Sequence, residues 1–446
     1  MNSKISLERY RADLLSRYEG KPISELPTPS FVVDLDIVRA NCSRMLNGVE
    51  ALSLYVGSFI NFRPHVKTHK TVEITRLELG ELHESVVAST LAELRGLGPL
   101  YDSGQVKDVL YGIPPAASKL SELAAIADYL DKTSDGVLKL IVDTVAEINM
   151  LKEFHEKYVR TLSWNVFVKI DLGDNRAGQM VSSPDLKEII DLLLDPNMTN
   201  SVNLVGFYAH RGHSYSATGE ESVISHLQQE LQGVLSAAEI VYGLAPAVAS
   251  KLTVSIGATP TAHAMATAAA DNLSGRAPSS FVVADMLKNL ITAHKLDGKI
   301  GALEIHAGNY AMLDLQQVAT GLISTENIAG KVIAEVLAYY PDRNEYLIDA
   351  GVLALAREPG RIEGIAGIEG EDQTGARWAV DRVSQEHGII TRIDNKDPTE
   401  PLRSWSVGDK VVLYPQHACI TSSMYQWYFA VEQGIVKDIL IPWRGW

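Results

Sequence analysis

Eight strand-like apolar runs alternate with helical patterns through the first two-thirds of this 446-residue chain, and this alternation constrains the fold most. Most intervals between the runs hold one helix. The runs span residues 60–67, 84–89, 108–113, 138–143, 165–172, 203–210, 251–258 and 301–308. Eight strands joined by helical crossovers predict a TIM-type (β/α)8 barrel. The interval 258–300 is long and predicts an additional helix or hairpin.

After residue 314 the pattern changes to short strands broken by Gly, Pro and Asp, with no helix expected before the last dozen residues. The runs span residues 328–339, 345–348, 362–368, 378–380, 388–393 and 410–414. This pattern predicts an all-β second domain. The length also favours two domains. We expect a barrel over residues 25–314 and a β domain over 315–446, joined by the N-terminal segment 1–24.

Charge and cysteine content narrow the class of protein. The net charge is −15 and the pI is near 5.3, which argues against nucleic acid or an anionic membrane as a partner. Two cysteines, Cys42 and Cys419, exclude a disulfide framework and fit a reducing compartment. Residues 1–20 lack the apolar core of a secretory signal, and no apolar run is long enough to cross a membrane. We therefore expect a cytoplasmic protein.

The first strand of the barrel ends in a basic segment, residues 62–71, in which Lys67 is the central candidate. Polar residues that follow a barrel strand are usual catalytic positions. If the strand continues, Arg63, His65 and Lys67 share one face, although Pro64 counts against a fully regular strand. A lysine held in a barrel mouth loses hydration, which favours the neutral, nucleophilic amine. The alternative is a basic surface loop that binds nothing.

The segment from Arg63 to Lys70 also resembles the cofactor-lysine motif of the D-serine dehydratase and D-threonine aldolase group. These are pyridoxal-phosphate enzymes of the alanine-racemase-like fold type. The resemblance continues along most of the chain. It implies pyridoxal 5′-phosphate on Lys67, a barrel followed by a β domain, and a homodimer.

Two later strands end in further candidates. Arg176 lies in a Gly-bounded turn, where it could present a cation to a substrate or cofactor, or form a salt bridge with Asp171 or Asp174. The similar loop in the family favours an active-site role. Tyr208 and His210 share a face at the end of their strand, and with Tyr215 they resemble the family's tyrosine-bearing strand that packs against the cofactor. His213 fits a surface histidine better.

The turns after the last two barrel strands are the expected phosphate site, because such barrels commonly bind phosphate there. Small residues, hydroxyls and free backbone N–H groups suit an anion. Each turn alone is a weak signal, but both resemble the family's phosphate-cradling turns. The candidates are Ser255, Gly257, Ala258 and Thr259 in the first turn, and Gly308, Asn309 and Tyr310 in the second.

A His-x-Cys pair near the C-terminus, His417 and Cys419, is the candidate metal site. On one face of an extended segment, imidazole and thiolate could grip one ion and leave positions open for substrate and water. The alternative is that Cys419 is a small buried apolar residue. The resemblance implies that the pair is the metal site. The aldolase branch carries aspartate at the position of Cys419, and thiolate suits Zn2+ better than magnesium or manganese.

Together these features imply a lyase that dehydrates D-serine to pyruvate and ammonia with pyridoxal phosphate and zinc. Lys67, His417 and Cys419 would be its catalytic residues, with D-threonine as a further small-molecule substrate. The alternatives on the same scaffold are a D-threonine aldolase or a 3-hydroxyaspartate dehydratase. A non-catalytic pyridoxal-phosphate carrier is a rival from another class, and the His-x-Cys pair speaks against it because a carrier needs no Lewis acid.

Overall fold

The computed structural model describes residues 2–274, 285, 288–289, 292–294, 297–370, 377–393 and 405–446. The chain forms two compact units. The barrel unit contains Ser43–Gly308 with the C-terminal Trp443–Trp446, and the β unit contains Met1–Cys42 with Asn309–Pro442. These units divide the chain differently from the boundaries expected from the sequence, because residues 25–42 and 309–314 lie in the β unit. We propose that each unit is a domain.

The barrel unit holds eight parallel strands in the order β2-β9-β8-β7-β6-β5-β4-β3. A parallel bridge between His65 and Val87 joins the two outer strands, so the barrel is nearly closed. The strands are β2 (Asn61–Pro64), β3 (Ser85–Ala88), β4 (Asp108–Tyr111), β5 (Val137–Val142), β6 (Trp164–Ile170), β7 (Val202–Ala209), β8 (Thr253–Ile256) and β9 (Ala302–Ala307). All eight predicted strands and the barrel fold are confirmed. The expected extra element in 258–300 lies partly outside the described residues.

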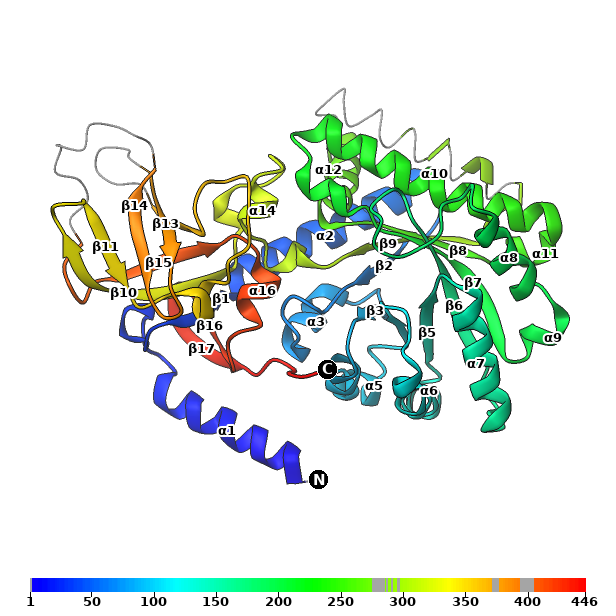
Figure 1. The fold of residues 1–446 in the computed structure, drawn as a ribbon, viewed down its shortest axis with the longest axis horizontal. Helices are drawn as coiled ribbons and strands as arrows, with labels where there is room; N and C mark the ends of the chain where they lie inside the picture. The colour runs from blue at the N-terminus through cyan, green and yellow to red at the C-terminus, as the bar shows by residue number, and fades with distance from the viewer. Residues whose placement is uncertain are drawn as a thin grey trace. The chain divides into compact units, whose positions relative to one another are not determined.

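Helices cover the outside of these strands (Figure 1). They are α2 (Leu35–Val56), which begins in the β unit, α3 (Val72–Leu79), α4 (Leu91–Gly96), α5 (Gly98–Asp102), α6 (Leu120–Ser134), α7 (Val145–Lys157), α8 (Pro184–Leu193), α9 (Pro196–Thr199), α10 (Glu220–Leu244), α11 (Pro246–Ala249) and α12 (Thr259–Ser274). The spacing of their apolar residues explains how these helices pack on the strands. In α6, for example, the buried residues on one face are Leu120, Leu123, Ala127 and Leu130. A capping box of Thr144 and Glu147 starts α7.

The barrel interior below the strand ends is polar and charge-balanced. Arg63 is fully buried, and its guanidinium contacts Glu304 at 2.7 Å and Asp108 at 2.8 Å. Lys139 reaches the same Asp108 carboxylate at 2.6 Å. Removing one partner of a buried ion pair costs several kcal/mol, about 3–5, because it leaves an uncompensated charge. This network therefore ties strands β2, β4, β5 and β9 together beneath the strand ends.

The β unit is a nine-stranded sheet in the order β11-β14-β13-β12-β15-β10-β1-β16-β17, with a further pairing of β11 to β10. Its strands are antiparallel except for the pair β1 and β16. They are β1 (Ser30–Asp34), β10 (Gly330–Tyr340), β11 (Glu345–Ile348), β12 (Ala366–Ile368), β13 (Trp378–Val383), β14 (Gly388–Arg392), β15 (Lys410–Pro415), β16 (Tyr428–Glu432) and β17 (Ile435–Leu440). Its helices are α1 (Asn2–Tyr18), α14 (Leu315–Val318), α15 (Val352–Leu355) and α16 (Ala418–Ser422). The predicted β domain is confirmed, but α14, α15 and α16 are short helices in the part of the chain where no helix was expected.

The expectation of a helix in the last dozen residues is wrong. Residues 428–440 form the antiparallel hairpin β16–β17 instead. Its turn consists of Gln433 and Gly434, whose φ angles are 51° and 74°. Two adjacent positive φ values are typical of the two-residue turn that joins β-strands. The strands on both sides are rich in aromatic and β-branched residues, which favour strand over helix.

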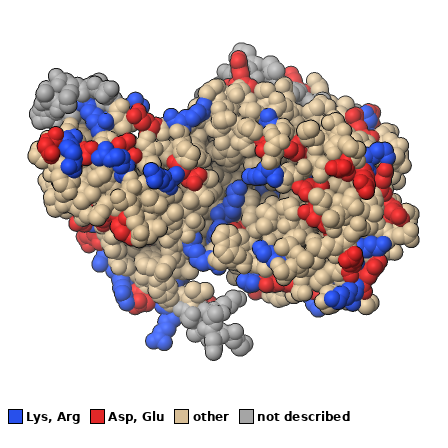
Figure 2. Space-filling model, viewed as in Figure 1, with Lys and Arg blue, Asp and Glu red and all other residues tan. Residues whose placement is uncertain are grey.

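Surface charge and helix length give two further properties of the molecule. On the face shown in Figure 2, acidic and basic side chains are interspersed over each unit. Within the described ranges, no helix combines the length and the apolar character needed to cross a membrane.

Candidate active site

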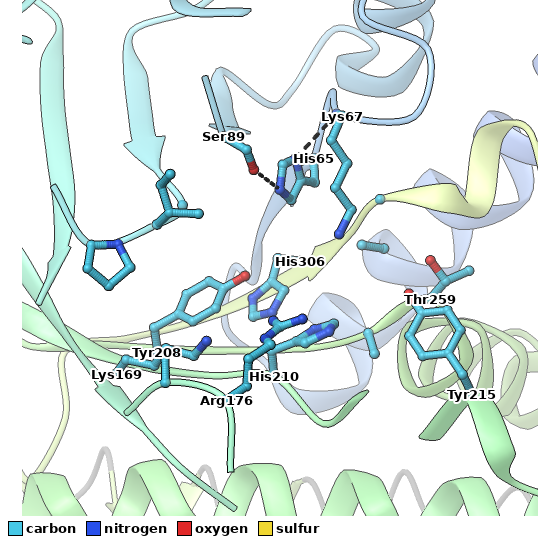
Figure 3. A pocket seen from close by; sticks show the side chains of 17 residues that line it. His65, Lys67, Ser89, Lys169, Arg176, Tyr208, His210, Tyr215, Thr259 and His306 are labelled. Carbon is cyan, nitrogen blue, oxygen red and sulfur yellow. Dashed lines mark hydrogen bonds between the residues drawn. The ribbon is translucent and has the colours of Figure 1, made fainter. Parts of the chain in front are cut away.

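A cavity of about 360 Å³ opens at the carboxyl ends of the barrel strands. Its described lining comes from the ends of β6, β7 and β9 and from the segments that follow β2, β3, β4, β6, β7, β8 and β9. The lining residues are His65, Lys67, Ser89, Gly112, Ile113, Pro114, Lys169, Arg176, Ala177, Tyr208, His210, Tyr215, Ala258, Thr259, His306, Ala307 and Gly308. Figure 3 shows Lys67 entering from one side, with Tyr208, Arg176, His210 and His306 on the facing side. All of these residues belong to the barrel unit.

The basic segment places Lys67 in this cavity and turns Lys70 away from it. The chain leaves β2 with the N–H of His65 bonded to the carbonyl of Ala307 and the N–H of Val66 bonded to the carbonyl of Val87. Lys67 follows and lines the cavity. Lys70 has a positive φ of 55°, and its ammonium pairs with the buried carboxylate of Glu93 at 3.1 Å. Of these two lysines, Lys67 is therefore the one available to a ligand in the cavity.

Three histidines line the cavity, and their hydrogen-bond partners fix the tautomer of each of them. The Nδ1 atom of His65 accepts a hydrogen bond from the N–H of Lys67, so a neutral His65 donates from Nε2 to Ser89 at 3.0 Å. His210 Nδ1 donates to the carbonyl of Gly257 at 2.8 Å, because a carbonyl can only accept. Burial, followed by the charge of Lys67, lowers the pKa of His65 and lowers that of His210 to about 3. Both rings are therefore neutral near pH 7.

The third histidine, His306, is held from below by the buried network. The hydroxyl of Ser255 donates to Glu304 at 2.7 Å and lies 3.0 Å from His306 Nδ1. Because the single proton of the hydroxyl is committed to Glu304, His306 Nδ1 must carry the proton of that bond. Burial lowers the pKa of His306, and its Nε2 atom has no hydrogen-bond partner in the part of the chain that the structure describes. Tyr208 stacks on this ring at 4.1 Å between centroids.

The two predicted phosphate turns lie at the cavity only in part. Ala258, Thr259 and Gly308 line it, and α12 begins at Thr259. Gly257 has a φ of 145°, and a Cβ there would lie 2.1 Å from the carbonyl oxygen of His306. Only glycine fits this close approach of two strands. A Cβ on Gly308 would lie 3.3 Å from the side chain of His65, so this glycine leaves room in the cavity.

Four predicted cofactor residues lie outside the cavity lining: Gly257, Ser255, Asn309 and Tyr310. Ser255 is buried beneath it, with its hydroxyl on Glu304 and His306. Asn309 and Tyr310 follow Gly308 in the β unit, and the side-chain amide of Asn309 donates to Asp314.

Arg176 lines the cavity from the loop after β6, and it forms no salt bridge with Asp171 or Asp174. The carboxylate of Asp171 accepts hydrogen bonds from three backbone N–H groups of its own loop. Asp174 accepts from the N–H of Gly212 and pairs with the exposed His213, as expected for a surface histidine. These bonds hold the loop without using the Arg176 guanidinium.

The His417–Cys419 pair lies in the β unit, in a geometry that differs from the extended segment we expected. His417 is extended, with φ −138° and ψ 100°, but α16 begins at Ala418, so Cys419 lies in a helical turn. Asp314 explains the bend, because its buried carboxylate accepts the N–H of Ala418 at 2.8 Å. The two side chains still contact each other. Burial alone would lower the pKa of His417, but its hydrogen bond to the Cys419 sulfur and the nearby acidic groups raise it to about 9.

The donor chemistry of this pair is compatible with a metal ion. Imidazole nitrogen and thiolate sulfur are preferred zinc ligands. His417 Nδ1 lies 3.7 Å from the carboxylate of Glu358 and has no hydrogen-bond partner among the residues described. The described residues contain no group of three or more His, Cys, Asp or Glu side chains that could hold a metal.

Sequence reasoning missed four polar cavity residues: His65, Ser89, Lys169 and His306. A period-2 signal was available for the last one, since Glu304 and His306 alternate with apolar Leu303 and Ile305 at the end of the strand. His65 was noted only as a neighbour of Lys67. The same signal was available for Lys169, which lies between apolar Val168 and Ile170, but Ser89 carried none.

Comparison with known proteins agrees with this fold and site. The family model "Putative serine dehydratase domain" matches residues 329–431. The chain is 36% identical to the D-serine dehydratase of Saccharomyces cerevisiae, over 98% of this chain and 100% of that protein. It is 37% identical to the D-serine dehydratase of Schizosaccharomyces pombe, over 100% of this chain and 98% of that protein. The structure of D-threo-3-hydroxyaspartate dehydratase from Delftia sp. HT23 superposes with a TM-score of 0.73 at 25% identity, covering 96% of this chain and 100% of that one.

A parallel barrel with a lysine-bearing cavity at its strand ends, followed by an antiparallel β unit, is the architecture of the fold-type III pyridoxal-phosphate enzymes. Within that class, the identities of 36% and 37% to two D-serine dehydratases, over nearly the full length of the chains, show the family. The chain belongs to the D-serine dehydratase family of lyases.

Proposed function

We propose that this protein dehydrates D-serine to pyruvate and ammonia with pyridoxal phosphate bound to Lys67. The observation that carries the proposal is the amine of Lys67 lining a cavity at the barrel mouth, while Lys70 is paired with Glu93. The choice of D-serine is supported by the two full-length relatives that bear that name.

The cavity offers a partner for each part of the cofactor. Lys67 would bond to its carbonyl carbon, and the turns of Gly257–Thr259 and Gly308 would receive its phosphate at the start of α12. Arg176, Tyr208, His210 and Tyr215 would surround its ring, with Asn309 and Tyr310 as further predicted contacts. Ser255 would act through His306. When bound, pyridoxal phosphate stabilises negative charge at the substrate Cα.

Lys67 is also the proposed base. Lys67 would hold the cofactor carbonyl, and its amine, which lines the cavity, would also be placed to take the Cα proton of the substrate. The cavity lining contains no carboxylate among the described residues that could compete for this role. The neighbouring histidines carry pKa values far below neutrality, so they are weak bases compared with a lysine amine.

The His417–Cys419 pair is the proposed zinc site. Bound zinc would act as a Lewis acid that turns the β-hydroxyl of the substrate into a better leaving group. The chain's own contribution is to hold the two ligands, with Asp314 fixing the backbone N–H between them. A thiolate ligand favours zinc over magnesium or manganese, and this favours the dehydratase activity over the aldolase activity.

The test is product analysis on the purified protein with D-serine and L-serine. We expect pyruvate and ammonia from D-serine and neither from L-serine, because the cofactor presents one face to Lys67. An aldehyde and glycine from D-threonine would instead identify an aldolase, and oxaloacetate from 3-hydroxyaspartate the alternative dehydratase. Absence of any product from a cofactor-loaded protein would favour a carrier.

We also propose that the protein is a cytoplasmic homodimer. Light scattering in solution would test the number of subunits.

A further inference from the structure

The C-terminal end of the chain is attached to the turn that carries Lys67. Residues Trp443–Trp446 belong to the barrel unit, although the preceding strand, β17, belongs to the β unit. The backbone N–H of Trp443 donates to the carbonyl of Lys70 at 2.8 Å. The side chain of Trp443 is half-buried, whereas that of Trp446 is 86% exposed. Trp443 is therefore a point at which this tail is fixed to the barrel unit.

The residue that Trp443 holds also closes the turn around Lys67. The N–H of Lys70 donates to the carbonyl of Val66 at 2.8 Å, so Lys67 lies inside the turn that these two residues close. Lys70 has a φ of 55°, and a residue with a side chain keeps such a conformation only when its surroundings hold it there. The ammonium of Lys70 pairs with Glu93 at 3.1 Å. The bond from Trp443 to the Lys70 carbonyl is thus one of three contacts that hold this residue.

The indole of Trp443 packs on α4, the helix that carries Glu93. This helix ends at Gly96, and a Cβ at that position would overlap the indole ring. Only a residue without a side chain leaves room for the indole there. Trp443 therefore contacts the lysine turn through its backbone and α4 through its side chain, and it fixes one of these elements relative to the other.

The same helix reaches the cavity by a second path. The buried carboxylate of Glu93 accepts the N–H of Ser89 at 2.6 Å. Figure 3 shows Ser89 bonded to His65, and His65 bonded to Lys67. A displacement of α4 relative to the lysine turn would therefore reach Lys67 both through the turn and through His65.

We propose that Trp443 is a positioning residue, which holds Lys67 in place by fixing the lysine turn to α4. The proposal rests on the proposed function in the role that it gives to Lys67. Trp443 is not among the described residues that line the cavity, so it acts through the turn rather than by touching a ligand. A shift of about 1 Å in a reacting group can slow a reaction on the order of 100-fold, so a small displacement of Lys67 has a large effect.

The test begins with Trp443→Ala in the cofactor-loaded protein. We expect kcat for D-serine to fall about 10- to 100-fold, with a much smaller change in KM, because Lys67 moves while the rest of the cavity lining is unchanged. The dissociation constant of pyridoxal phosphate, measured by equilibrium dialysis, should rise about 10-fold, because binding must then also order the turn. Trp443→Phe keeps the N–H and an aromatic ring on Gly96, and it should recover most of both losses.

Gly96→Ala tests the same contact from the other side. In the wild type its Cβ displaces the indole, so this variant should lose turnover and cofactor affinity as Trp443→Ala does. In the Trp443→Ala background the Cβ has room, and the double variant should resemble either single variant. Effects that multiply in the double variant would show that the two residues act independently, and they would overturn the proposal.

Two controls accompany these variants. Trp446→Ala removes an exposed indole from the same tail, and Gly243→Ala adds a Cβ in α10 that meets no described atom within 4 Å. Both should match the wild type in turnover and in cofactor affinity. A lower unfolding midpoint of Trp443→Ala, with wild-type kcat and cofactor affinity, would show that Trp443 supports only the fold, and the proposal would be wrong. If Trp443→Ala does not fold, wild-type kcat in a folded Gly96→Ala would lead to the same conclusion.

Failure of this inference and failure of the proposed function give different results. If the proposed function is wrong, the wild type forms no pyruvate from D-serine, and the cofactor affinities of the variants still test whether Trp443 positions Lys67. If the inference is wrong, the wild type is active and Trp443→Ala equals it in both measurements.

Discussion

At the scale of single residues, this cavity is organised by side chains that hold other side chains. The Ser255 hydroxyl bonds both to Glu304, which pairs with Arg63, and to His306, so it fixes the His306 ring relative to this ion pair. The carbonyl of Gly257 accepts the hydrogen bond that holds His210. The N–H of Lys67 itself fixes the tautomer of His65. The ring nitrogens are thus set as donors or acceptors before any ligand arrives, which reduces the reorganisation needed on binding.

The role of Lys67 gives the sharpest residue-scale prediction. Lys67→Ala should abolish both the visible absorption of the protein-bound cofactor and pyruvate formation, while circular dichroism stays unchanged, because the substitution removes the only predicted covalent link to the cofactor. Lys70→Ala is the matched control. Its ammonium is engaged with Glu93, so this variant should keep the absorption. Loss of the absorption in Lys70→Ala, with the absorption kept in Lys67→Ala, would show that Lys70 rather than Lys67 binds the cofactor.

At the scale of elements, the turn from β8 into α12 joins the phosphate site to the histidines. Gly257 ends the strand, its carbonyl holds His210, and α12 begins two residues later. The N–H of Ala258 is already bonded to the hydroxyl of Thr261, which keeps the turn tight. One glycine therefore controls the start of the helix, the approach to β9 and the orientation of a cavity histidine.

We predict that Gly257→Ala destabilises the protein by more than about 1 kcal/mol, because alanine is strained at positive φ and its Cβ would meet the backbone of His306. Cofactor affinity should fall in the same variant, as measured by dialysis against cofactor-free buffer. Gly243→Ala in α10 is the control, since a Cβ there meets nothing within 4 Å. It should be neutral or stabilising in thermal unfolding. Similar midpoints for both variants would count against a special role for Gly257.

At the scale of the whole molecule, the cavity lining and the proposed metal ligands belong to different compact units. The described lining consists of barrel residues, and His417, Cys419 and Asp314 belong to the β unit. No residue of the described lining is a proposed metal ligand. Binding of the cofactor and binding of the metal should therefore be separable in solution, although the proposed reaction needs both.

This separation predicts the effect of removing the metal. A chelator should stop elimination from D-serine and leave the visible absorption of the cofactor intact, and added zinc should restore activity. Cys419→Ala should lose zinc and activity together, whereas Cys419→Asp should shift metal preference toward manganese or magnesium and weaken dehydration. Metal analysis by mass spectrometry and a pyruvate assay measure the two effects. Full zinc content and full turnover in Cys419→Ala would show that the His417–Cys419 pair is not the metal site.

The fold class could be predicted from the sequence, because the periods of its apolar residues are local properties. Eight runs with helical intervals predicted the barrel, and the change of pattern after residue 314 predicted the β unit. Lys67 could be identified for the same reason, because its position after a strand is recognisable from the neighbouring residues alone. The hairpin β16–β17 was missed because its Gln-Gly turn is a weak signal beside the familiar Asn-Gly.

How distant residues combine could be seen only in the folded structure. Arg63 can be buried because the carboxylates of Asp108 and Glu304 neutralise its charge. These residues lie 45 and 241 residues further along the chain, so no local pattern reveals the charge balance. His306 and Lys169 became cavity residues when the barrel brought their strand ends together. Asp314, more than 100 residues before Ala418, bends the His-x-Cys segment into a helix. Such pairings depend on barrel closure and sheet register, and these are properties of the whole fold rather than of any one stretch of sequence.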